Sequence, residues 1–508
     1  MSGPEPLTAR MPFSILTCMQ DTMPVTEPAR ALLVGAEWEP GEGPVLLEVR
    51  APFGNDLLAT VRESTRAEVD AAIGLAVRTQ GAQELTPFER ARILRRASEL
   101  IAERAEEFGR SVVAEAGKPI RDARAEVARA VLTFELCAQE ATRLGGEVIP
   151  VDATPGSENR RAFTMSRPAG VVCAITPFNG PVNQLSHKVP TAIAAGCTVV
   201  VKPAEVTPLS AIMLVQTLLD AGLPPGHVTM VQGRGETVGQ QLLEDPRFAV
   251  YSFTGSTAVG KHIRNTVGLR KTLLELGNNS ANLVHEDADL RFAAKTLARS
   301  LSGYAGQVCI SAQRIVVHER IFDQFAGLLA DEVRALVVGD PSDEETHVGP
   351  MISIEAAERT ERWIKEAVSE GAQLWCGGER SGQLVTPAVL TRPAAESNLA
   401  CHEAFAPVAV LMPYATLGEA VQTANNTEYG LQAGLFTSSL DVALAVAQRL
   451  EVGGVIVNDA SSYRVDSMPY GGVKDSGTGR EGVRYAVEEM TESRLVVLNL
   501  HEPAGQGL

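Results

Sequence analysis

Hydrophobic positions first repeat with a helical period just after residue 85. Thr86 can cap a helix, Pro87 suits its first turn, and Glu89 completes a capping box. Apolar side chains then recur three or four residues apart, which predicts one buried stripe. The stripe consists of Phe88, Ile93, Leu94, Ala97, Leu100 and Ile101. A similar repeat predicts a second amphipathic helix over residues 121–144.

Further along, short apolar runs alternate with amphipathic stretches. The runs cover residues 171–175, 198–201, 228–231 and 250–253. The stretches cover residues 186–195, 209–221 and 237–243. We expect Thr207 to cap the second stretch and Gly222 to end it. Buried strands that alternate with helices predict a parallel sheet with helices on its faces, and ligands bind such sheets at the carboxyl ends of the strands.

The remaining segments predict a second α/β unit and an exposed extension. Strand and helix patterns alternate again from residue 287 to about residue 473. Residues 152–161 and 495–500 have the pattern of exposed strands suited to pairing with another subunit. Residues 1–30 precede the first patterned segment, and we expect them to form a disordered N-terminal extension.

Charge and cysteine usage narrow the class of protein. The chain of 508 residues carries a net charge of −17, which disfavours nucleic acid and anionic membranes as partners. Its seven cysteines are scattered, with no C-x-x-C pair, and its eight histidines include no H-x-x-x-H pair. This pattern predicts reduced thiols, a cytoplasmic location and no metal site. No apolar run approaches the roughly 18 residues of a membrane span.

Two glycine-rich segments suggest nucleotide binding. Gly233, Gly235 and Gly239 nearly match a dinucleotide fingerprint, but the last glycine is one residue late, and a turn without a ligand explains them as well. Residues 255–261 resemble a phosphate-binding loop as far as its lysine. His262 then stands where Ser or Thr must reach Mg²⁺. A strand-to-helix turn facing a pyrophosphate therefore explains these glycines better than an NTPase does.

Cys309 and Glu275 are the candidate reactive groups. Cys309 lies in a polar, glycine-bearing segment away from the apolar runs, whereas we expect the other cysteines to be structural. Glu275 lies inside an apolar stretch, where burying a carboxylate is costly unless it is hydrogen-bonded or protonated. Glu275 is therefore either a satisfied structural carboxylate or a base with a raised pKa that can activate water.

Considered together, these motifs resemble the aldehyde dehydrogenase superfamily over nearly all of the chain after residue 30. They occur in order as Pro177-Phe178-Asn179, Lys202-Pro203-Ala204-Glu205, 253–256, Glu275-Leu276-Gly277, 306–309, 403–407 and 469–472. The resemblance implies an α/β fold with a Rossmann-type NAD-binding domain, an α/β catalytic domain and a small β extension for oligomerisation. The corresponding residues are 31–145 with 168–277, then 278–485, and 146–167 with 486–508.

The resemblance also implies roles for individual residues. The Cys309 thiolate would attack the aldehyde carbon, Asn179 and the Cys309 backbone N–H would hold the oxyanion, and Glu275 would activate water to hydrolyse the thioester. The implied cofactor-binding residues are Thr176, Pro177, Phe178, Lys202, Ala204, Glu205, Gly233, Gly255, Ser256, Gly277, Glu403 and Phe405.

Within the cofactor-binding set, the resemblance places Lys202 and Glu205 at the adenosine ribose and Ser256 at the pyrophosphate. It places Glu403 and Phe405 at the nicotinamide ribose. The carboxylate of Glu205 would repel a 2′-phosphate, which favours NAD over NADP.

Departures from the family pattern bear on the substrate. Asn278-Asn279 replaces the usual Gly-Lys, so the local geometry there is expected to differ. Ala406 and the segment 458–474 look like lactaldehyde-type members, which oxidise small hydroxylated aldehydes, with relatives that take phosphonate-bearing ones. Relatives that bind phosphonoacetaldehyde carry histidine and arginine where this chain has Gly180 and Ala305 or its neighbour Tyr304. That particular substrate is therefore disfavoured.

Arg121 and Arg124 lie three residues apart on one predicted helix face and are candidates for binding an anionic substrate tail. A solvated basic face paired with Glu126 or Asp122 explains them equally well. Two other functions fit the sequence less well. A CoA-acylating relative is disfavoured by Glu275, and a non-catalytic scaffold is disfavoured by the joint presence of Cys309, Asn179 and Glu275. The family implies a homodimer or a homotetramer.

Overall fold

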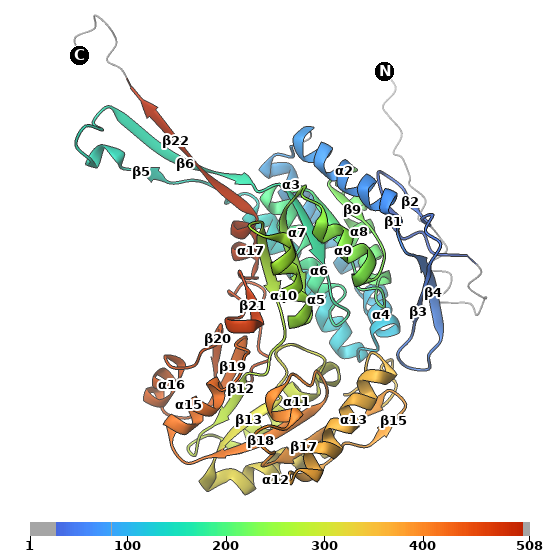
Figure 1. Cartoon of the computed structure of the whole chain (residues 1–508), viewed down its shortest axis with the longest axis vertical. Coiled ribbons are helices and arrows are strands. Elements are labelled where there is room, and N and C mark those ends of the chain that lie inside the picture. The colour runs from blue at the N-terminus through green and yellow to red at the C-terminus, as the bar shows by residue number, and fades with distance from the viewer. Residues whose placement is uncertain (1–26, 83, 501–508) are drawn as a thin grey trace, which may run out of the picture.

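The computed structural model describes residues 27–82 and 84–500. Most of the expected N-terminal extension, residues 1–30, lies outside the described residues, as do residues 501–508 of the predicted C-terminal oligomerisation segment. Two α/β bodies lie one above the other, and a three-stranded arm projects from the upper one (Figure 1). The predicted fold class, a Rossmann-type α/β unit joined to a second α/β unit, is confirmed.

The first body is built on a largely parallel sheet with the strand order β2-β1-β9-β8-β7-β10-β11-β21. Its parallel strands are β7 (Val171–Ile175), β8 (Val199–Lys202), β9 (Val228–Met230), β10 (Phe248–Thr254) and β11 (Lys271–Glu275). Antiparallel strands β1 (Leu32–Leu33), β2 (Trp38–Glu39) and β21 (Gly477–Thr478) flank them. The predicted apolar runs are therefore strands, buried on both faces as parallel strands usually are.

Helices cover both faces of this sheet. One face packs on α3 (Pro87–Glu103), α4 (Ala105–Ala116), α5 (Ile120–Glu140), α7 (Val189–Ala195) and α8 (Leu209–Asp220). The other packs on α2 (Arg66–Ala82), α9 (Gln240–Glu244) and α10 (Thr257–Val267). The short helix α6 (Asn183–Ser186) precedes α7. The capping box of Thr86 and Glu89 at the start of α3 is confirmed.

The predicted cap of α8 is wrong. Its N-cap residue is Pro208, and no side chain of the N-cap position binds the helix. Instead the buried Glu115 carboxylate, from α4, accepts hydrogen bonds from the backbone N–H groups of Leu209 (2.7 Å) and Ser210 (2.8 Å). The Glu115 carboxylate, from another helix, thus caps α8 in place of the expected Thr207 hydroxyl.

The second body is a further parallel sheet with the strand order β14-β17-β18-β13-β12-β19-β20, in which only β14 is antiparallel among the described strands. Its strands are β12 (Ala281–Val284), β13 (Arg314–His318), β14 (Gln373–Cys376), β17 (Ala388–Thr391), β18 (Val408–Tyr414), β19 (Gln432–Phe436) and β20 (Gly454–Val457). Its main helices are α11 (Leu290–Ser302), α12 (Phe322–Arg334), α13 (Ile354–Ser369), α15 (Leu417–Asn425) and α16 (Leu440–Ala447). The second alternating region of the sequence is therefore an α/β unit, as predicted.

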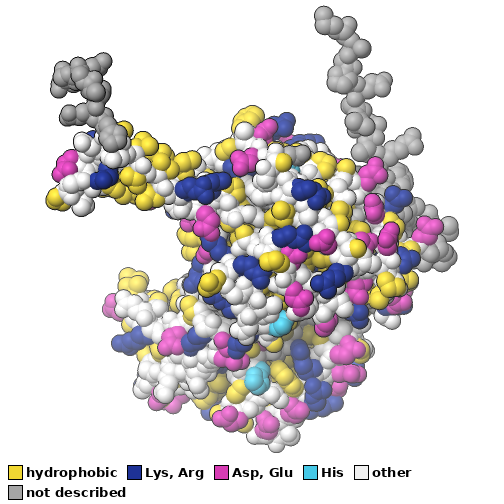
Figure 2. Space-filling model, turned by 45° about the horizontal axis from the view of Figure 1, so that its top comes forward, with side chains coloured by type: hydrophobic (Ala, Val, Ile, Leu, Met, Phe, Trp, Pro, Cys, Tyr) yellow, Lys and Arg dark blue, Asp and Glu magenta, His cyan; other side chains and the backbone are white. Residues whose placement is uncertain are grey.

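The arm consists of β5 (Val148–Ile149), β6 (Arg160–Pro168) and β22 (Thr491–Asn499), with β6 in the centre. The strand predicted over residues 152–161 is wrong, because residues 151–153 form a 3-10 turn and Gly156 has a φ of 83°, which no strand accommodates. The C-terminal strand is confirmed, although it begins earlier than residue 495. Figure 2 shows hydrophobic side chains gathered on the projecting arm.

The domain boundaries assigned from the sequence stay a prediction. Strand β21, at residues 477–478, pairs with β11 of the first sheet although it falls within the predicted catalytic segment 278–485. Among the described residues, no helix has the length and hydrophobicity needed to cross a membrane.

Candidate active site

The loop that carries Cys309 has an unusual backbone. Tyr304, Ala305 and Gly306 are all left-handed, with φ values of 46°, 51° and 68°. Left-handed conformations cost about 1–3 kcal/mol each at non-glycine residues, so the surrounding structure must hold this loop in place. At Gly306 a Cβ atom would lie 2.1 Å from the carbonyl oxygen of Ala406, which means that the two backbones touch. Close backbone packing therefore constrains the loop three residues before Cys309.

The Cys309 thiol is partly buried beside a tyrosine. Its Sγ lies 3.0 Å from the Tyr470 hydroxyl. Burial raises the pKa of Cys309 to about 12, and the Tyr470 hydrogen bond and the Arg464 charge oppose this shift. The sulfur is therefore a protonated thiol near neutral pH, and it becomes a competent nucleophile only when a base removes its proton.

Glu275 ends strand β11 and is buried. One of its carboxylate oxygens has no hydrogen-bond partner among the described residues. Burial, and then the nearby charge of Glu481, raises the pKa of Glu275 well above its usual range. A Cβ atom on Gly471 would lie only 2.9 Å from Glu275 Oε1. Since Tyr470 contacts Cys309, two adjacent residues lie beside the thiol and the carboxylate.

Asn179 contacts the same loop from the first body. Its side-chain amide donates a hydrogen bond to the carbonyl of Gln307 (2.9 Å), two residues before Cys309. Its backbone carbonyl accepts a hydrogen bond from Lys118 Nζ (2.7 Å). The structure therefore brings Cys309, Glu275 and Asn179 into one site where the two bodies meet.

A buried ionic network surrounds this site, and the sequence patterns assigned it no role. Glu481 accepts hydrogen bonds from Lys188 and Arg464, both at 3.0 Å, and His187 lies 3.0 Å from Asp466. Burial would raise the pKa of Glu481, but the charges of Lys188, His187 and Arg464 hold it well below its usual range. Single charged residues inside apolar stretches, such as Lys188, were the signal that could have revealed the network.

The predicted ribose-binding pair, Lys202 and Glu205, lies at the carboxyl end of β8. Lys202 is buried, and its Nζ lies 3.7 Å from Glu205 Oε2. Burial lowers the pKa of Lys202 from its usual value. The backbone N–H of Thr176, at the end of β7, donates to the carbonyl of Lys202 (3.2 Å), so the ends of these neighbouring strands lie together.

The glycines of this region mark close approaches. Gly255 follows β10, and its backbone N–H donates to the carbonyl of Glu275 (3.0 Å). Ser256 caps α10 by accepting a hydrogen bond from Val259. Gly233 follows β9, where a Cβ atom would lie 2.3 Å from Val238. The N-terminus of α10, which carries a partial positive charge, favours a phosphate group.

Glu403 and Phe405 approach from the second body. Glu403 accepts a hydrogen bond from the Asn278 backbone N–H (2.8 Å), and burial raises its pKa to about 7. A Cβ atom on Gly277 would lie 2.7 Å from Glu403 Oε2. Phe405 has a left-handed φ of 48°, and its ring meets the ring of Phe178 edge to face at 6.0 Å.

These positions fit a dinucleotide. The predicted residues lie after β7, β8, β9 and β10, at the carboxyl ends of adjacent parallel strands, where α/β sheets bind nucleotides. They offer an ammonium and carboxylates for ribose hydroxyls, and a helix N-terminus for a pyrophosphate. Residues 27–82 and 84–500 contain no cluster of His, Cys, Asp and Glu suited to a metal ion.

The phosphate-loop lysine and the departures near Glu275 have structural contacts. Lys261 forms an ion pair with Asp475, and His262 bonds to Gln240 (2.8 Å). Asn278 Oδ1 accepts hydrogen bonds from the Ser280 and Leu431 backbones at 2.9 and 3.3 Å. The amide at residue 278 thus ties the end of β11 to the second body.

The two arginine candidates for substrate binding lie at the start of α5. Arg124 binds the carboxylates of Glu106 and Glu344, at 2.9 and 2.8 Å. Arg121 is exposed and donates to the carbonyl of Thr346 (3.1 Å). Neither arginine pairs with Glu126 or Asp122, the partners considered from the sequence.

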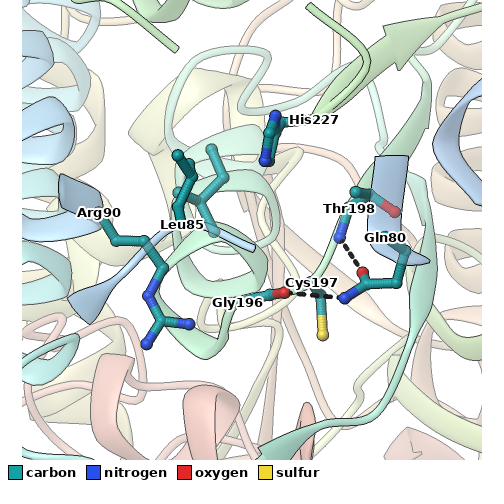
Figure 3. A pocket seen from close by; sticks show the side chains of 8 residues that line it. Gln80, Leu85, Arg90, Gly196, Cys197, Thr198 and His227 are labelled. Carbon is teal, nitrogen blue, oxygen red and sulfur yellow. Dashed lines mark hydrogen bonds between the residues drawn. The ribbon is translucent and has the colours of Figure 1, made fainter. Parts of the chain in front are cut away.

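Figure 3 shows a separate pocket, which lies at the start of strand β8. It is lined by Gln80, Leu85, Arg90, Ile193, Gly196, Cys197, Thr198 and His227. Thr198 directly precedes β8, whereas Lys202 ends it, so this pocket is distinct from the nucleotide crevice. Gln80 donates to the Gly196 carbonyl (3.1 Å) and accepts from the Thr198 N–H (2.6 Å), so it joins α2 to the start of β8.

Comparisons with known proteins agree with this geometry. The model of the aldehyde dehydrogenase family matches residues 38–496. A 3-sulfolactaldehyde dehydrogenase from Priestia aryabhattai is 47% identical over 469 residues, which is 92% of this chain and 98% of that protein. The chain therefore belongs to the aldehyde dehydrogenase family. By class of enzyme it is an aldehyde dehydrogenase. A lactaldehyde dehydrogenase from Methanococcus vannielii is 39% identical over 458 residues, which is 89% of this chain and 97% of that protein, so the resemblance to lactaldehyde-type members is confirmed.

Solved structures show the same fold. Aldehyde dehydrogenase 21 from Physcomitrella patens, in complex with its reaction product succinate, has a TM-score of 0.90 and 38% identity, and the match covers 94% of this chain and 99% of that one. A glyceraldehyde-3-phosphate dehydrogenase from Methanocaldococcus jannaschii, in complex with NADP, has a TM-score of 0.86 and 38% identity. That match covers 89% of this chain and 99% of that one.

Proposed function

We propose that this enzyme oxidises a small hydroxylated or anionic aldehyde to its carboxylic acid with NAD, through a thioester on Cys309. The observation that carries the proposal is the pair of adjacent residues Tyr470 and Gly471: Tyr470 contacts the Cys309 sulfur, and Gly471 approaches the Glu275 carboxylate. A nucleophile and a base held beside adjacent residues can act one after the other on the same carbon atom.

The proposed reaction has three stages: attack by the sulfur, hydride transfer and hydrolysis of the thioester. A base takes the thiol proton, the sulfur bonds to the aldehyde carbon, and the carbonyl electron pair moves to oxygen. The Asn179 amide and the Cys309 backbone N–H stabilise that oxyanion, and losing one such donor costs about 3–4 kcal/mol of barrier. NAD, when bound, supplies the hydride acceptor. Glu275 then takes a proton from the water that attacks the thioester, and the acid leaves as the C–S bond breaks.

Lys202, Glu205, Ser256 and Glu403 would hold the cofactor, together with the backbone at the glycines described above. The carboxylate of Glu205, within 3.7 Å of Lys202 Nζ, supports NAD because it would repel a 2′-phosphate. The NADP complex of the Methanocaldococcus relative makes NADP the alternative to be tested.

The substrate class rests on the relatives. One is named for 3-sulfolactaldehyde, one binds succinate as its product, and one is named for glyceraldehyde 3-phosphate, which supports an anionic aldehyde. Another is named for lactaldehyde, which supports a hydroxylated aldehyde. Arg121 is the better candidate of the two arginines for binding the anionic tail, because Arg124 is already neutralised by two carboxylates. The neighbouring Asp122 accepts a hydrogen bond from the Tyr304 backbone (3.3 Å), which puts the start of α5 against the Cys309 loop.

Two other functions make different predictions. A CoA-acylating enzyme would transfer the acyl group to a thiol, and the buried Glu275 argues against it because thiol transfer needs no base for water. A non-catalytic scaffold would have no need to bury a free carboxylate beside a thiol, since that arrangement costs stability.

The arm supports assembly into a homodimer or homotetramer. Strand β22 is at the edge of its sheet and leaves one row of backbone groups free to pair with another strand. The free cysteines of the described residues support a reducing compartment, and a cytoplasmic location remains our prediction.

The proposal is tested by measuring NADH or NADPH formation with 3-sulfolactaldehyde, lactaldehyde, succinate semialdehyde and propanal, each with and without CoA. We expect turnover with NAD, a preference for 3-sulfolactaldehyde over the uncharged aldehydes, and no effect of CoA. Strict dependence on CoA, or no turnover of any of the four aldehydes, would contradict the proposal. In Arg121→Ala, KM for 3-sulfolactaldehyde should rise while KM for propanal stays the same.

A further inference from the structure

The Tyr470 side chain is held in one position against the nucleophilic sulfur. Its hydroxyl lies 3.0 Å from Cys309 Sγ and has no other hydrogen-bond partner among the described residues. Its backbone pairs with Glu481 in both directions, at 2.9 and 2.6 Å. The Arg464 guanidinium lies 3.7 Å from the centre of its ring. Backbone pairing and ring stacking therefore aim this hydroxyl at the sulfur.

Once the Cys309 thiol ionises, the only proton left between the two side chains is that of the Tyr470 hydroxyl. Burial, and then the neighbouring thiol, raises the pKa of Tyr470 well above its usual range, so the phenol keeps its proton at working pH. A thiolate has no proton to donate. The hydrogen bond must then run from the Tyr470 O–H to the Cys309 sulfur.

Four groups set the charge around the sulfur. The Tyr470 hydrogen bond and the Arg464 charge favour the thiolate, whereas Glu403 and Glu275 disfavour it. Arg464 also lies over the face of the phenol ring, where a cation draws electron density toward itself and makes the O–H a better donor. Its own charge is compensated by Glu481 at 3.0 Å.

We propose that Tyr470 is a catalytic residue whose hydroxyl donates a hydrogen bond to the Cys309 thiolate and stabilises it for attack on the aldehyde. The phenol keeps its proton throughout, and no bond to it forms or breaks. This inference rests on the proposed function, because it assumes that Cys309 is the nucleophile. The alternative role for Tyr470 is that of an aromatic wall, which a phenylalanine would supply equally well.

The test is the pH dependence of Cys309 alkylation by iodoacetamide, which needs neither aldehyde nor cofactor. In Tyr470→Phe we expect the midpoint of the alkylation profile to rise by about one pH unit, so that labelling near neutral pH slows about tenfold. In the same variant kcat/KM should fall at neutral pH and recover partly at alkaline pH.

Tyr251→Phe is the matched control. Tyr251 is also buried, lies beneath an arginine (Arg270, 5.1 Å from the ring centre) and donates to a backbone carbonyl, that of Leu242 (3.1 Å). It contacts no group of the active site described here. Its loss should lower the unfolding temperature without moving the alkylation midpoint.

A second variant should shift the alkylation midpoint in the opposite direction. Site-specific replacement of Tyr470 by 3-fluorotyrosine keeps the ring and makes the phenol more acidic, so it should donate a stronger hydrogen bond and lower the alkylation midpoint. Unchanged midpoints in both Tyr470 variants would overturn this inference while leaving the thioester mechanism intact. The mechanism itself fails separately, if Cys309→Ser keeps wild-type turnover.

Discussion

At the scale of single residues, Glu275 shows how burial prepares a group for chemistry. Burial and the charge of Glu481 raise its pKa, so the carboxyl holds its proton to a higher pH than a solvated glutamate does. A base with a raised pKa binds the proton of an attacking water more strongly. The same burial carries a cost, because ionising the group in the folded state is unfavourable.

This environment predicts the pH dependence of hydrolysis. Thioester hydrolysis should speed up as the pH rises through a midpoint well above that of a solvated glutamate, because only the ionised base can accept the proton. Glu275→Gln should abolish this dependence and slow steady-state turnover by about 10²–10⁴-fold. Steady-state NADH formation measured from pH 5 to pH 9 checks both statements; an unchanged rate would contradict them.

Stability provides an independent control for that variant. A carboxyl whose pKa is raised on folding contributes stability at low pH that is lost as the pH rises above the unfolded-state value. Glu275→Gln removes this pH-dependent loss of folding stability. The variant should therefore unfold at the same temperature as the wild type near neutral pH, or at a higher one, even though its turnover falls.

Cys309 and Glu275 stood out from their local settings and Asn179 from the family resemblance, and the structure brings these three residues together. Tyr470 was noted only as part of a motif, because its partner Cys309 lies 161 positions away. Pairings of this kind depend on how two bodies meet. No local pattern in a single sequence predicts how the two bodies contact each other.

At the scale of elements, the loop before Cys309 depends on a glycine. In Gly306→Ala the added methyl would meet the Ala406 carbonyl at 2.1 Å and would also face a positive φ of 68°. Gly382→Ala is the matched control, since Gly382 has a φ of 61° but nothing within 4 Å of the added carbon. The control isolates the cost of backbone strain from that of the clash.

We expect Gly306→Ala to lose about 1–3 kcal/mol more of the free energy of unfolding than Gly382→Ala. It should also lose most of its activity, because the loop that carries the nucleophile must shift. Urea unfolding and kcat/KM measure the two effects. Equal losses of stability in the two variants, with activity retained in both, would show that the close packing at Gly306 does not position the nucleophile.

Elements with a strong local pattern were predictable, and those that depend on distant partners were not. The apolar runs became strands, and the capping box of Thr86 and Glu89 formed as expected. The cap of α8 was wrong because Glu115, on another helix, binds its first N–H groups. The strand expected over residues 152–161 failed because a polar pattern does not distinguish a strand from an exposed turn.

At the scale of the whole molecule, the arm is the feature that a single chain does not explain. Leu495 and Val497 lie on the same face of β22 and are 56% and 47% exposed. Exposed apolar strands at a sheet edge are usually covered by a partner. We therefore expect the purified enzyme to be an oligomer that buries this face.

Sedimentation measures this directly. Leu495→Asp combined with Val497→Asp should convert the oligomer to a smaller species, because each new charge would have to be desolvated in the interface. Leu269→Asp is the control, since Leu269 is fully exposed outside the arm. A wild type that sediments as a monomer, or a double variant with the wild-type mass, would contradict the prediction.

The two-body architecture was predictable because the strand and helix pattern repeats in both halves of the chain. The way in which the bodies meet was not. The contact from Asn179 to Gln307 joins the two bodies across a long sequence separation, and it helps to create the site.

The most direct test of the account is mass spectrometry of Glu275→Gln after mixing with 3-sulfolactaldehyde and NAD. The account predicts a burst of NADH close to one per subunit and an acyl group attached to the peptide that contains Cys309. Steady turnover without any adduct, or an adduct on a residue other than Cys309, would contradict it.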